Sequence, residues 1–421
     1  MKKNIWIWNH YATNMIKDKA GRHYWLAENL IINGYNPTIF CASTLHNSDE
    51  NIDTEGNIFI KKESKNIPFV IVKTPKYSGN GKKRIINMFS FYKNLFPTAM
   101  RYANKYGKPD VILASSVHPL TLVAGIKIAK KLGVPCICEV RDLWPESIVA
   151  YGSLKRNSVI ARILYLGEKW IYKNADKLIF TMAGGKDYIY ERKWDKFNGG
   201  PIDIGKVYSI NNGVDLNAFN YNKQNCQYDD EDLNNPEIFK IVYTGSIRLV
   251  NKVEMLVDVA KRLRDKKIKI LIWGSGDQLE IIQQRISKEQ LNNIILKGKV
   301  DKKYIPNILS KSNLNIILGD SNDIFRFGLS PNKLFEYFAA GKPILQTFMA
   351  NYSLVKINKA GLELNNNDPI AISEAIEYFL KLSQEEYIKY CENALAASKE
   401  YSYEKLTSRL VNVIESKNME G

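Results

Sequence analysis

The sequence predicts an α/β protein made of two doubly wound, nucleotide-binding-type halves. Apolar strand-like runs alternate with amphipathic helical stretches along the chain, as in parallel sheets with crossover helices. The chain has 421 residues, and a usual domain has about 100–200, so two domains are expected. The alternation is interrupted once, by the polar and acidic stretch 221–236, which we interpret as a linker.

The first half begins with the apolar run 4–8, a buried strand. Residues 21–33 follow with helical spacing, since Trp25, Leu26, Leu30 and Ile31 share one side. The same criteria give the other elements of this half. Strands are expected at 4–8, 37–42, 70–72, 111–114, 136–140, 177–181 and 207–210, and helices at 21–33, 122–131 and 159–173.

The second half repeats the alternation after the linker. Strands are expected at 239–243, 267–273, 293–297, 314–318 and 343–346, and helices at 252–264, 278–287, 304–310, 331–340 and 369–382. We therefore predict an N-terminal domain over residues 1–220 and a C-terminal domain over 237–400. A last helix, at 403–418, is long enough to pack back on the first domain.

Composition excludes several classes of protein. Hydrophobic residues make up 45% of the chain, which excludes disorder over most of its length. No run of about 18 apolar residues occurs, so a membrane-spanning helix is not expected. The apolar stretch at the N-terminus is too short for a signal peptide. Five scattered cysteines, an odd number outside zinc-site spacings, favour a reducing compartment, so we expect a cytoplasmic protein.

The net charge of +16 is unevenly distributed. Between Lys61 and Arg101, ten cations face one acid, Glu63, and aromatic and aliphatic residues are interleaved with them. This mixture suits an amphipathic segment on an anionic membrane surface. A solvated basic loop followed by a partly buried helix is the alternative.

The segment Ser330–Pro343 carries the most informative motif, Ser-Pro-Asn-Lys-Leu-Phe-Glu-Tyr-Phe-Ala-Ala-Gly-Lys-Pro. Ser330 is expected to cap a helix that starts at Pro331 and stops at Gly341. Backbone N–H groups of Asn332, Lys333 and Leu334 would then attract a phosphate. Glu336, about one turn further on, would accept hydrogen bonds from ribose hydroxyls.

Two glycine-bearing turns follow strands of the second half. In Tyr243-Thr244-Gly245-Ser246-Ile247-Arg248, Gly245 allows close backbone approach, while Arg248 and Lys252 supply cations that could neutralise a diphosphate leaving group. Gly274 lies in the turn Trp273–Asp277, where a plain tight turn is an equal alternative. No phosphate-binding loop of the Gly-x-x-x-x-Gly-Lys-Ser/Thr type occurs, so ATP hydrolysis of that type is not expected.

Over nearly the whole chain, these motifs resemble those of GT-B glycosyltransferases of the retaining family 4. The likeness is closest to bacterial transferases of O-antigen and capsule assembly, such as those that add N-acetylfucosamine. The segments that carry it are Gly21–Tyr24, Glu139–Ser147, Asn212–Asp215, Tyr243–Ser246 and Ser330–Pro343. The resemblance implies two Rossmann-like domains facing an interdomain cleft, with acceptor bound by the first and nucleotide sugar by the second.

The resemblance also assigns residues to roles. Arg248 and Lys252 match the diphosphate-binding pair, and Glu336 matches the second Glu of the family's E-x7-E motif, whose first position is Gly328 here. The expected donor-binding residues are Gly245, Ser246, Gly274, Val300, Ser330, Asn332, Lys333, Leu334 and Glu336. The expected acceptor-side residues are Gly21, Arg22, His23 and Arg141.

Asp142 follows a predicted buried strand and precedes Trp144-Pro145. It is our candidate for orienting or deprotonating the acceptor hydroxyl, with an N-cap or an ion pair with Arg141 as the alternative. Each of the four histidines, taken alone, is more often structural than catalytic. Asp320 and Asp323 do not have the Asp-x-Asp spacing of metal-dependent sugar transfer, and we interpret them as loop residues.

The sequence thus predicts a glycosyltransferase that uses no metal and no cofactor, and the resemblance implies that the transfer retains the anomeric configuration. The resemblance suggests a UDP-sugar donor and a polyprenyl-diphosphate-linked saccharide acceptor in surface-polysaccharide (lipopolysaccharide or capsule) synthesis. The enzyme would then be peripheral at the inner face of the cell membrane, with no nucleic-acid partner. The alternatives are a nucleotide-sugar epimerase of GT-B architecture and a non-catalytic membrane-surface scaffold.

Overall fold

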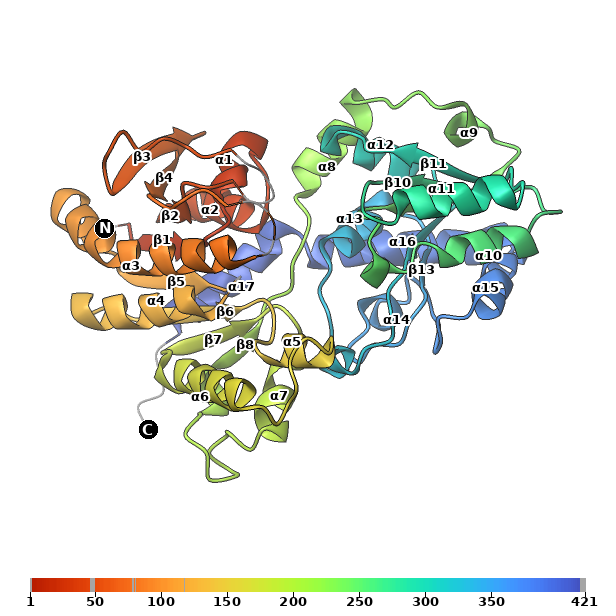
Figure 1. Ribbon diagram of the computed structural model, residues 1–421. Coiled ribbons are helices and arrows are strands. Elements are labelled where there is room, and N and C mark those ends of the chain that lie inside the picture. The colour runs from red at the N-terminus through yellow and green to blue at the C-terminus, as the bar shows by residue number, and fades with distance from the viewer. Residues whose placement is uncertain (1, 46–49, 78, 80, 117, 417–421) are drawn as a thin grey trace. The chain divides into compact units, whose positions relative to one another are not determined.

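The computed structural model describes residues 2–45, 50–77, 79, 81–116 and 118–416, and it contains two compact units (Figure 1). One unit runs to Asn211 and takes up the chain again from Leu406, and the other comprises Asn212–Lys405. Each unit is built on its own mainly parallel sheet with helices packed against it. The predicted α/β class with two parallel-sheet domains is confirmed.

The first unit contains an eight-stranded sheet in the order β3-β4-β2-β1-β5-β6-β7-β8. Adjacent strands are parallel except at one edge, where β3 runs antiparallel to β4. We did not predict the edge strand β3, in which three successive residues are charged and exposed. The strands are β1 (Asn4–Trp8), β2 (Asn36–Ala42), β3 (Phe59–Ser64), β4 (Ile67–Val72), β5 (Val111–Ser115), β6 (Cys136–Val140), β7 (Lys177–Phe180) and β8 (Val207–Ser209).

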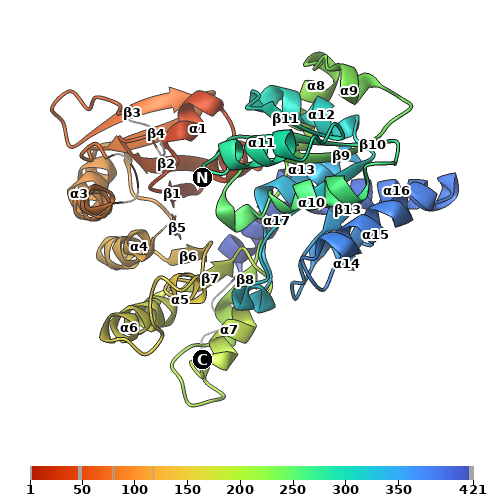
Figure 2. The same cartoon turned by 45° about the vertical axis from the view of Figure 1, so that its right-hand side comes forward.

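The helices of this unit connect successive strands of the sheet. Three of them, α3, α4 and α6, lie side by side and are seen nearly end-on in Figure 2. The described helices are α1 (Thr13–Asp18), α2 (Arg22–Ile32), α3 (Lys82–Tyr106), α4 (Pro119–Leu132), α5 (Glu146–Ala150), α6 (Val159–Asn174), α7 (Gly185–Glu191) and the short 3-10 turn η1 (Ile204–Lys206).

The last helix, α17 (Tyr403–Glu415), contributes most of its length to the first unit. The Lys177 ammonium donates to the Val413 carbonyl oxygen at 2.5 Å, and the Tyr35 hydroxyl donates to Glu415 at 2.9 Å. Glu415 also pairs with Lys3. Residues 417 and 418, which we included in this helix, lie outside the described part of the chain.

The second unit contains a six-stranded parallel sheet in the order β11-β10-β9-β12-β13-β14. All five predicted strands of this half are present, and β14 is an additional short edge strand. The strands are β9 (Phe239–Thr244), β10 (Ile268–Trp273), β11 (Ile294–Gly298), β12 (Leu314–Ile317), β13 (Ile344–Gln346) and β14 (Gly361–Glu363).

Helices cover the sheet of the second unit. The region that we predicted as a linker is part of this unit and is partly helical. Residues 212–236 belong to this unit, because Val214, Phe219 and Leu233 are buried in its core. The boundary between the units therefore falls before residue 220, and 221–236 is not a free linker. The helices are α8 (Leu216–Asn225), α9 (Glu231–Asn234), η2 (Leu249–Asn251), α10 (Met255–Arg262), α11 (Leu279–Lys288), η3 (Lys302–Tyr304), α12 (Ile305–Ser310), η4 (Asp323–Phe327), α13 (Asn332–Ala340), α14 (Leu354–Ile357), α15 (Pro369–Lys381) and α16 (Gln384–Glu400).

Both sheets are buried on two faces, as is usual for parallel sheets with crossover helices. In the first unit, Trp6, Phe40 and Tyr102 form a cluster of tilted and edge-on rings. Among the described residues, no helix combines the length and apolar content needed to cross a membrane.

Candidate functional site

In the second unit, the predicted donor-binding residues gather at the carboxyl ends of β9, β10 and β11 and at the start of α13. Open parallel sheets bind their ligands at this edge. Gly245 has a φ of +143°, a backbone conformation that disfavours any side chain. A Cβ atom on Gly245 would lie 2.7 Å from the Lys333 ammonium nitrogen, so the glycine leaves room for that lysine.

Gly274 has a structural role in the same turn. A Cβ atom there would lie 1.9 Å from the Gly245 carbonyl oxygen, and one on Gly276 would lie 2.0 Å from the Ile247 carbonyl oxygen. The Ile247 N–H donates to the Ser275 carbonyl at 2.9 Å. The two loops after β9 and β10 therefore pack backbone against backbone, which fixes the position of Gly245 and Ser246.

Lys333 is held over the ring of Tyr243. Its ammonium nitrogen lies 4.2 Å from the ring centroid and 3.1 Å from the hydroxyl oxygen. That hydroxyl in turn donates to the Ser246 carbonyl oxygen at 2.8 Å, so its lone pair is available to Lys333. Tyr337, one turn along the same helix as Lys333, accepts a hydrogen bond from the Thr244 N–H at 3.1 Å. These contacts attach α13 to the end of β9.

The prediction that Ser330 caps the helix is wrong. Helix α13 begins at Asn332 with Pro331 as its N-cap residue, and no side chain caps it. The Ser330 hydroxyl instead accepts the Asn212 N–H at 2.8 Å, and the Asn212 amide donates to the Ser330 carbonyl at 2.6 Å. A tertiary partner has thus replaced the local capping interaction. The expectation that the Leu334 N–H is available to a phosphate is also wrong, because this group donates to the Pro331 carbonyl at 3.1 Å. The Leu334 side chain is buried in the core.

Burial shifts the pKa values of two side chains of α13, Lys333 and Glu336, toward neutral pH. It raises the pKa of Glu336 to about 7, against the opposing effect of Lys302 and Lys333. Burial also lowers the pKa of Lys333 to about 8, although Glu336 opposes this shift. Both groups can therefore change charge near neutral pH.

Arg248 and Lys252 flank the short turn η2. Arg248 is exposed, and no ion pair joins it to any described residue. Lys252 has a left-handed φ of +51° and lies 3.4 Å from a carboxylate oxygen of Asp320, which follows β12. Two cations are therefore presented at the edge where Gly245 and Lys333 lie, as the sequence spacing suggests.

Gly328 occupies the position where the family motif has its first acid. Its φ is +80° and its ψ is 172°, a region that is essentially restricted to glycine. A glutamate at this position would strain the backbone. Val300 follows β11 and packs against the core of the second unit.

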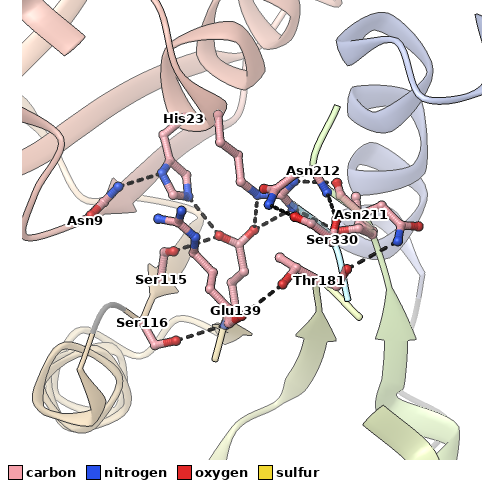
Figure 3. A network of polar contacts seen from close by, with 12 residues as sticks. Asn9, His23, Ser115, Ser116, Glu139, Thr181, Asn211, Asn212 and Ser330 are labelled. Atoms are coloured by element: carbon pink, nitrogen blue, oxygen red, sulfur yellow. Dashed lines mark hydrogen bonds and ion pairs between the residues drawn. The ribbon is translucent and has the colours of Figure 1, made fainter. Parts of the chain in front are cut away.

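In the first unit, His23 points toward a buried carboxylate, Glu139 (Figure 3), which also binds Arg22. The Arg22 guanidinium donates to Glu139 at 2.7 Å and also to the carbonyls of Ile210 and Asn211. His23 lies 2.8 Å from the other carboxylate oxygen, which also accepts the Ser115 hydroxyl at 2.7 Å. These polar groups satisfy one another inside the fold.

The charge state of Glu139 follows from its partners. Burial alone would raise the pKa of the carboxyl, but Arg22 and His23 outweigh it and hold the pKa well below its usual range. Burial lowers the pKa of His23. Arg22 and His23 therefore connect the start of α2 to β6 at the carboxyl edge of this sheet. We did not predict Glu139 as their partner, although an acidic residue within an apolar strand indicates a buried charge that needs a partner.

Arg141 and Asp142 directly follow β6. The Ser116 hydroxyl accepts the Arg141 N–H at 3.0 Å, and the Thr181 hydroxyl donates to its carbonyl at 3.2 Å. Asp142 is exposed and forms no ion pair with a described residue. Gly21 precedes α2 with a φ of +113°.

A pair of buried histidines lies at the same edge. His10 Nδ1 is 2.6 Å from His118 Nε2, and His10 Nε2 is 2.7 Å from the Asn87 side-chain oxygen. Burial, with a contribution from Arg84, lowers the pKa of His118 to about 3. The pair was missed because its members are 108 positions apart.

No group of three or more His, Cys, Asp or Glu side chains suited to a metal ion occurs within the described ranges. Asp320 and Asp323 are ion-paired with Lys252 and Arg326, respectively.

Two parallel-sheet units, with cations and glycines at the carboxyl edge of the second, define the GT-B class of glycosyltransferase. Residues 24–218 match the family described as Glycosyltransferase Family 4, and residues 238–381 match Glycosyl transferases group 1. The chain belongs to the family 4 glycosyltransferases and is an enzyme of that class, as the sequence motifs suggested. The match disfavours the epimerase and scaffold alternatives.

Known relatives support the assignment. The chain is 21% identical to WbjE of Pseudomonas aeruginosa, named as a probable glycosyltransferase, over 73% of this chain and 75% of WbjE. It is 23% identical to TuaH of Bacillus subtilis, whose name places it in teichuronic acid biosynthesis, over 63% of this chain and 64% of TuaH. Anabaena HepE, solved with UDP and glucose, has the same fold, with a TM-score of 0.65 and 14% identity over 99% of this chain and 100% of HepE.

Proposed function

We propose that the protein is a retaining, metal-independent glycosyltransferase that moves a sugar from a UDP-sugar to a polyprenyl-diphosphate-linked saccharide. The reaction would belong to bacterial surface-polysaccharide synthesis at the inner face of the cell membrane. In this proposal the second unit binds the donor and the first binds the acceptor.

The observation that carries the donor assignment is the arrangement of Lys333 against Gly245 and Tyr243. It presents an ammonium group beside a glycine turn at the carboxyl edge of a parallel sheet, next to the first turn of α13. The first backbone N–H groups of a helix lack intrahelical acceptors and attract phosphate oxygens, and in α13 this leaves Asn332 and Lys333, since the Leu334 N–H is bonded to Pro331. A diphosphate placed here would meet Lys333, Asn332 and the loop of Ser246.

Arg248 and Lys252 are assigned to the leaving group. When the bond from the anomeric carbon to the diphosphate breaks, negative charge develops on the departing oxygen. Cations at that position lower the barrier, because electrostatic stabilisation of developing charge is usually the largest single contribution to catalysis. With these cations available the transfer requires no metal ion. Glu336 would accept hydrogen bonds from the ribose hydroxyls.

The acceptor hydroxyl is assigned to the first unit. Asp142 is exposed after β6, where it can orient that hydroxyl or take up its proton. The family resemblance implies front-side attack, so that the departing diphosphate helps to accept the proton and the anomeric configuration is kept. Gly21 and Arg141 would shape the acceptor side, with Arg22 and His23 acting as its buried support.

The lipid-linked acceptor is supported by charge and by relatives. In α3, Lys82 and Lys83 are exposed beside the exposed side chains of Ile85, Ile86 and Phe89. Such a mixture suits a bilayer surface. The name of TuaH refers to a cell-surface polymer.

A donor screen tests the proposal. The purified protein is incubated with UDP- and GDP-sugars in EDTA, with and without a polyprenyl-diphosphate-linked saccharide, and nucleoside diphosphate and glycolipid are quantified. We expect equal amounts of UDP and extended glycolipid, with the anomeric configuration retained. Activity abolished by EDTA and restored by Mg²⁺ or Mn²⁺ would contradict the metal-independent mechanism.

A further inference from the structure

Helix α6 carries a row of exposed apolar side chains on the surface of the first unit. Val159, Ile163, Leu166 and Trp170 follow one another at intervals of three or four residues, so they form one stripe along the helix. The exposed fractions are 72% for Val159, 61% for Ile163 and 68% for Leu166. Ile160 widens the stripe at its N-terminal end. The opposite side of the helix is buried in the core, so the stripe is not required for folding.

A basic cavity of about 510 Å³ opens beside this stripe. Four of its lining residues are cations, namely Arg156, Arg162, Lys169 and Arg192, and none is an acid. Tyr165 and Trp194 provide the remaining rigid surface, while Leu166 belongs to both the cavity and the stripe. The cavity is therefore a concave cationic site that borders an apolar ridge.

Two of the four cations, Arg192 and Arg156, are held in place by contacts within the fold. The Arg192 guanidinium lies 3.7 Å from the ring centroid of Tyr165 and 5.0 Å from that of Trp194. Glu146 accepts the Arg156 guanidinium at 2.5 Å and the Tyr165 hydroxyl at 2.6 Å. Four cations line the cavity, so it keeps a net positive charge beside Glu146. An anionic group that entered would meet the guanidinium groups of Arg192 and Arg156, whose positions are already fixed.

We propose that the α6 stripe and this cavity form a docking surface for an anionic phospholipid bilayer, with lipid phosphates in the cavity and acyl chains against the stripe. The charge complementarity supports it, because apolar side chains bordered by Lys and Arg characterise interfacial helices. The inference rests on the proposed function in one respect, namely that the surface serves to hold the enzyme beside a lipid-linked acceptor.

Other occupants fit the surface less well. A second copy of this chain packed with two-fold symmetry would bring two identical cationic cavities together, which like-charge repulsion opposes. A nucleic acid would use the cations but would leave the large aliphatic side chains of α6 exposed to water. A bilayer satisfies both parts of the surface.

Flotation of the full chain with vesicles tests the proposal. Vesicles of phosphatidylcholine alone are compared with vesicles containing 30% phosphatidylglycerol, at about 50 mM and 500 mM salt. We expect the wild type to bind the anionic vesicles at low salt and to dissociate at high salt. Arg162→Glu with Lys169→Glu should weaken binding at least tenfold, and so should Ile160→Ser, Ile163→Ser and Leu166→Ser combined.

A matched control reverses two exposed cations of the second unit, Lys267→Glu with Lys288→Glu, and should bind within about twofold of wild type. Binding of the two α6 variants at the wild-type level would overturn the proposal. So would a wild-type dimer in light scattering that the α6 variants make monomeric, because the occupant would then be a second copy.

The two proposals fail in different experiments. UDP binding and UDP-sugar hydrolysis in solution should be unchanged in the α6 variants, since none of these residues belongs to the donor site. If the α6 variants lose vesicle binding but wild type transfers no sugar, the surface stands and the proposed function fails. If they transfer sugar to membrane-embedded acceptor at the wild-type rate and bind vesicles equally, only the surface fails.

Discussion

The Lys333 ammonium nitrogen lies 3.1 Å from the hydroxyl oxygen of Tyr243 and 4.2 Å from the centroid of its ring. The tyrosine accepts from the lysine and donates to the Ser246 carbonyl at 2.8 Å. One side chain thus fixes both a cation and the turn that would face a diphosphate. A partly desolvated lysine positioned in this way loses little side-chain entropy when an anion binds.

Tyr243→Phe keeps the ring but removes the acceptor for Lys333. We expect the affinity for UDP to fall by about fivefold, which corresponds to the net value of one hydrogen bond, about 1 kcal/mol. Titration calorimetry measures the change. Tyr378→Phe, an exposed tyrosine of the same unit, serves as the control and should leave the affinity unaltered.

Donor affinity should depend on pH in a bell shape. The cationic form of Lys333 binds diphosphate and is lost as pH rises through its pKa of about 8. The ionised form of Glu336 accepts ribose hydroxyls and is lost as pH falls through its pKa of about 7. Affinity for UDP should therefore be highest between these values. Glu336→Gln should remove the acid limb only, and an unchanged acid limb in that variant would refute the assignment.

Arg248→Ala and Lys252→Ala should each lower turnover by about 10²–10³, because each removes a cation from the leaving group. Steady-state kinetics with saturating donor measures the loss, and circular dichroism checks the fold. Lys267→Ala, an exposed cation of the same unit, is the control. Near-normal turnover in both variants would exclude these residues from catalysis.

The buried network around Glu139 should make the first unit sensitive to acid. The pKa of His23 is lowered in the fold, so below about pH 6.5 the unfolded chain takes up a proton that the folded chain does not. The pKa of Glu139 is also lowered, so its contribution is lost as pH falls below about 4.5. Stability should thus decrease on acidification in both ranges.

Glu139→Gln leaves Arg22 buried without a counter-charge and should destabilise the unit by about 3–5 kcal/mol. Hydrogen–deuterium exchange of α2 and β6 amides reports on this unit separately. Exchange rates equal to those of wild type at pH 7 would show that the network does not stabilise the fold.

Apolar runs and the helical spacing of apolar residues predicted most buried strands and the helices that connect them. Buried parallel strands are continuous apolar runs and are therefore easy to find in a sequence. The edge strand β3 was missed because Lys61, Lys62 and Glu63 are charged and exposed, and charge at an edge protects against aggregation. Gly245 and Lys333 were predicted from their local context. Local sequence could not reveal that Ser330 binds Asn212, or that Arg22 reaches Glu139, since both partners are distant in sequence.

The central claim, that the carboxyl edge of the second unit binds a nucleoside diphosphate through its cations, is tested most directly by comparing UDP with UMP. Titration calorimetry is carried out in EDTA on wild type and on the Arg248→Ala, Lys252→Ala double variant. We predict that wild type binds UDP at least tenfold more tightly than UMP and that this preference is much smaller in the double variant, which keeps only Lys333. Equal affinities of wild type for UDP and UMP, or an undiminished preference in the double variant, would contradict the account.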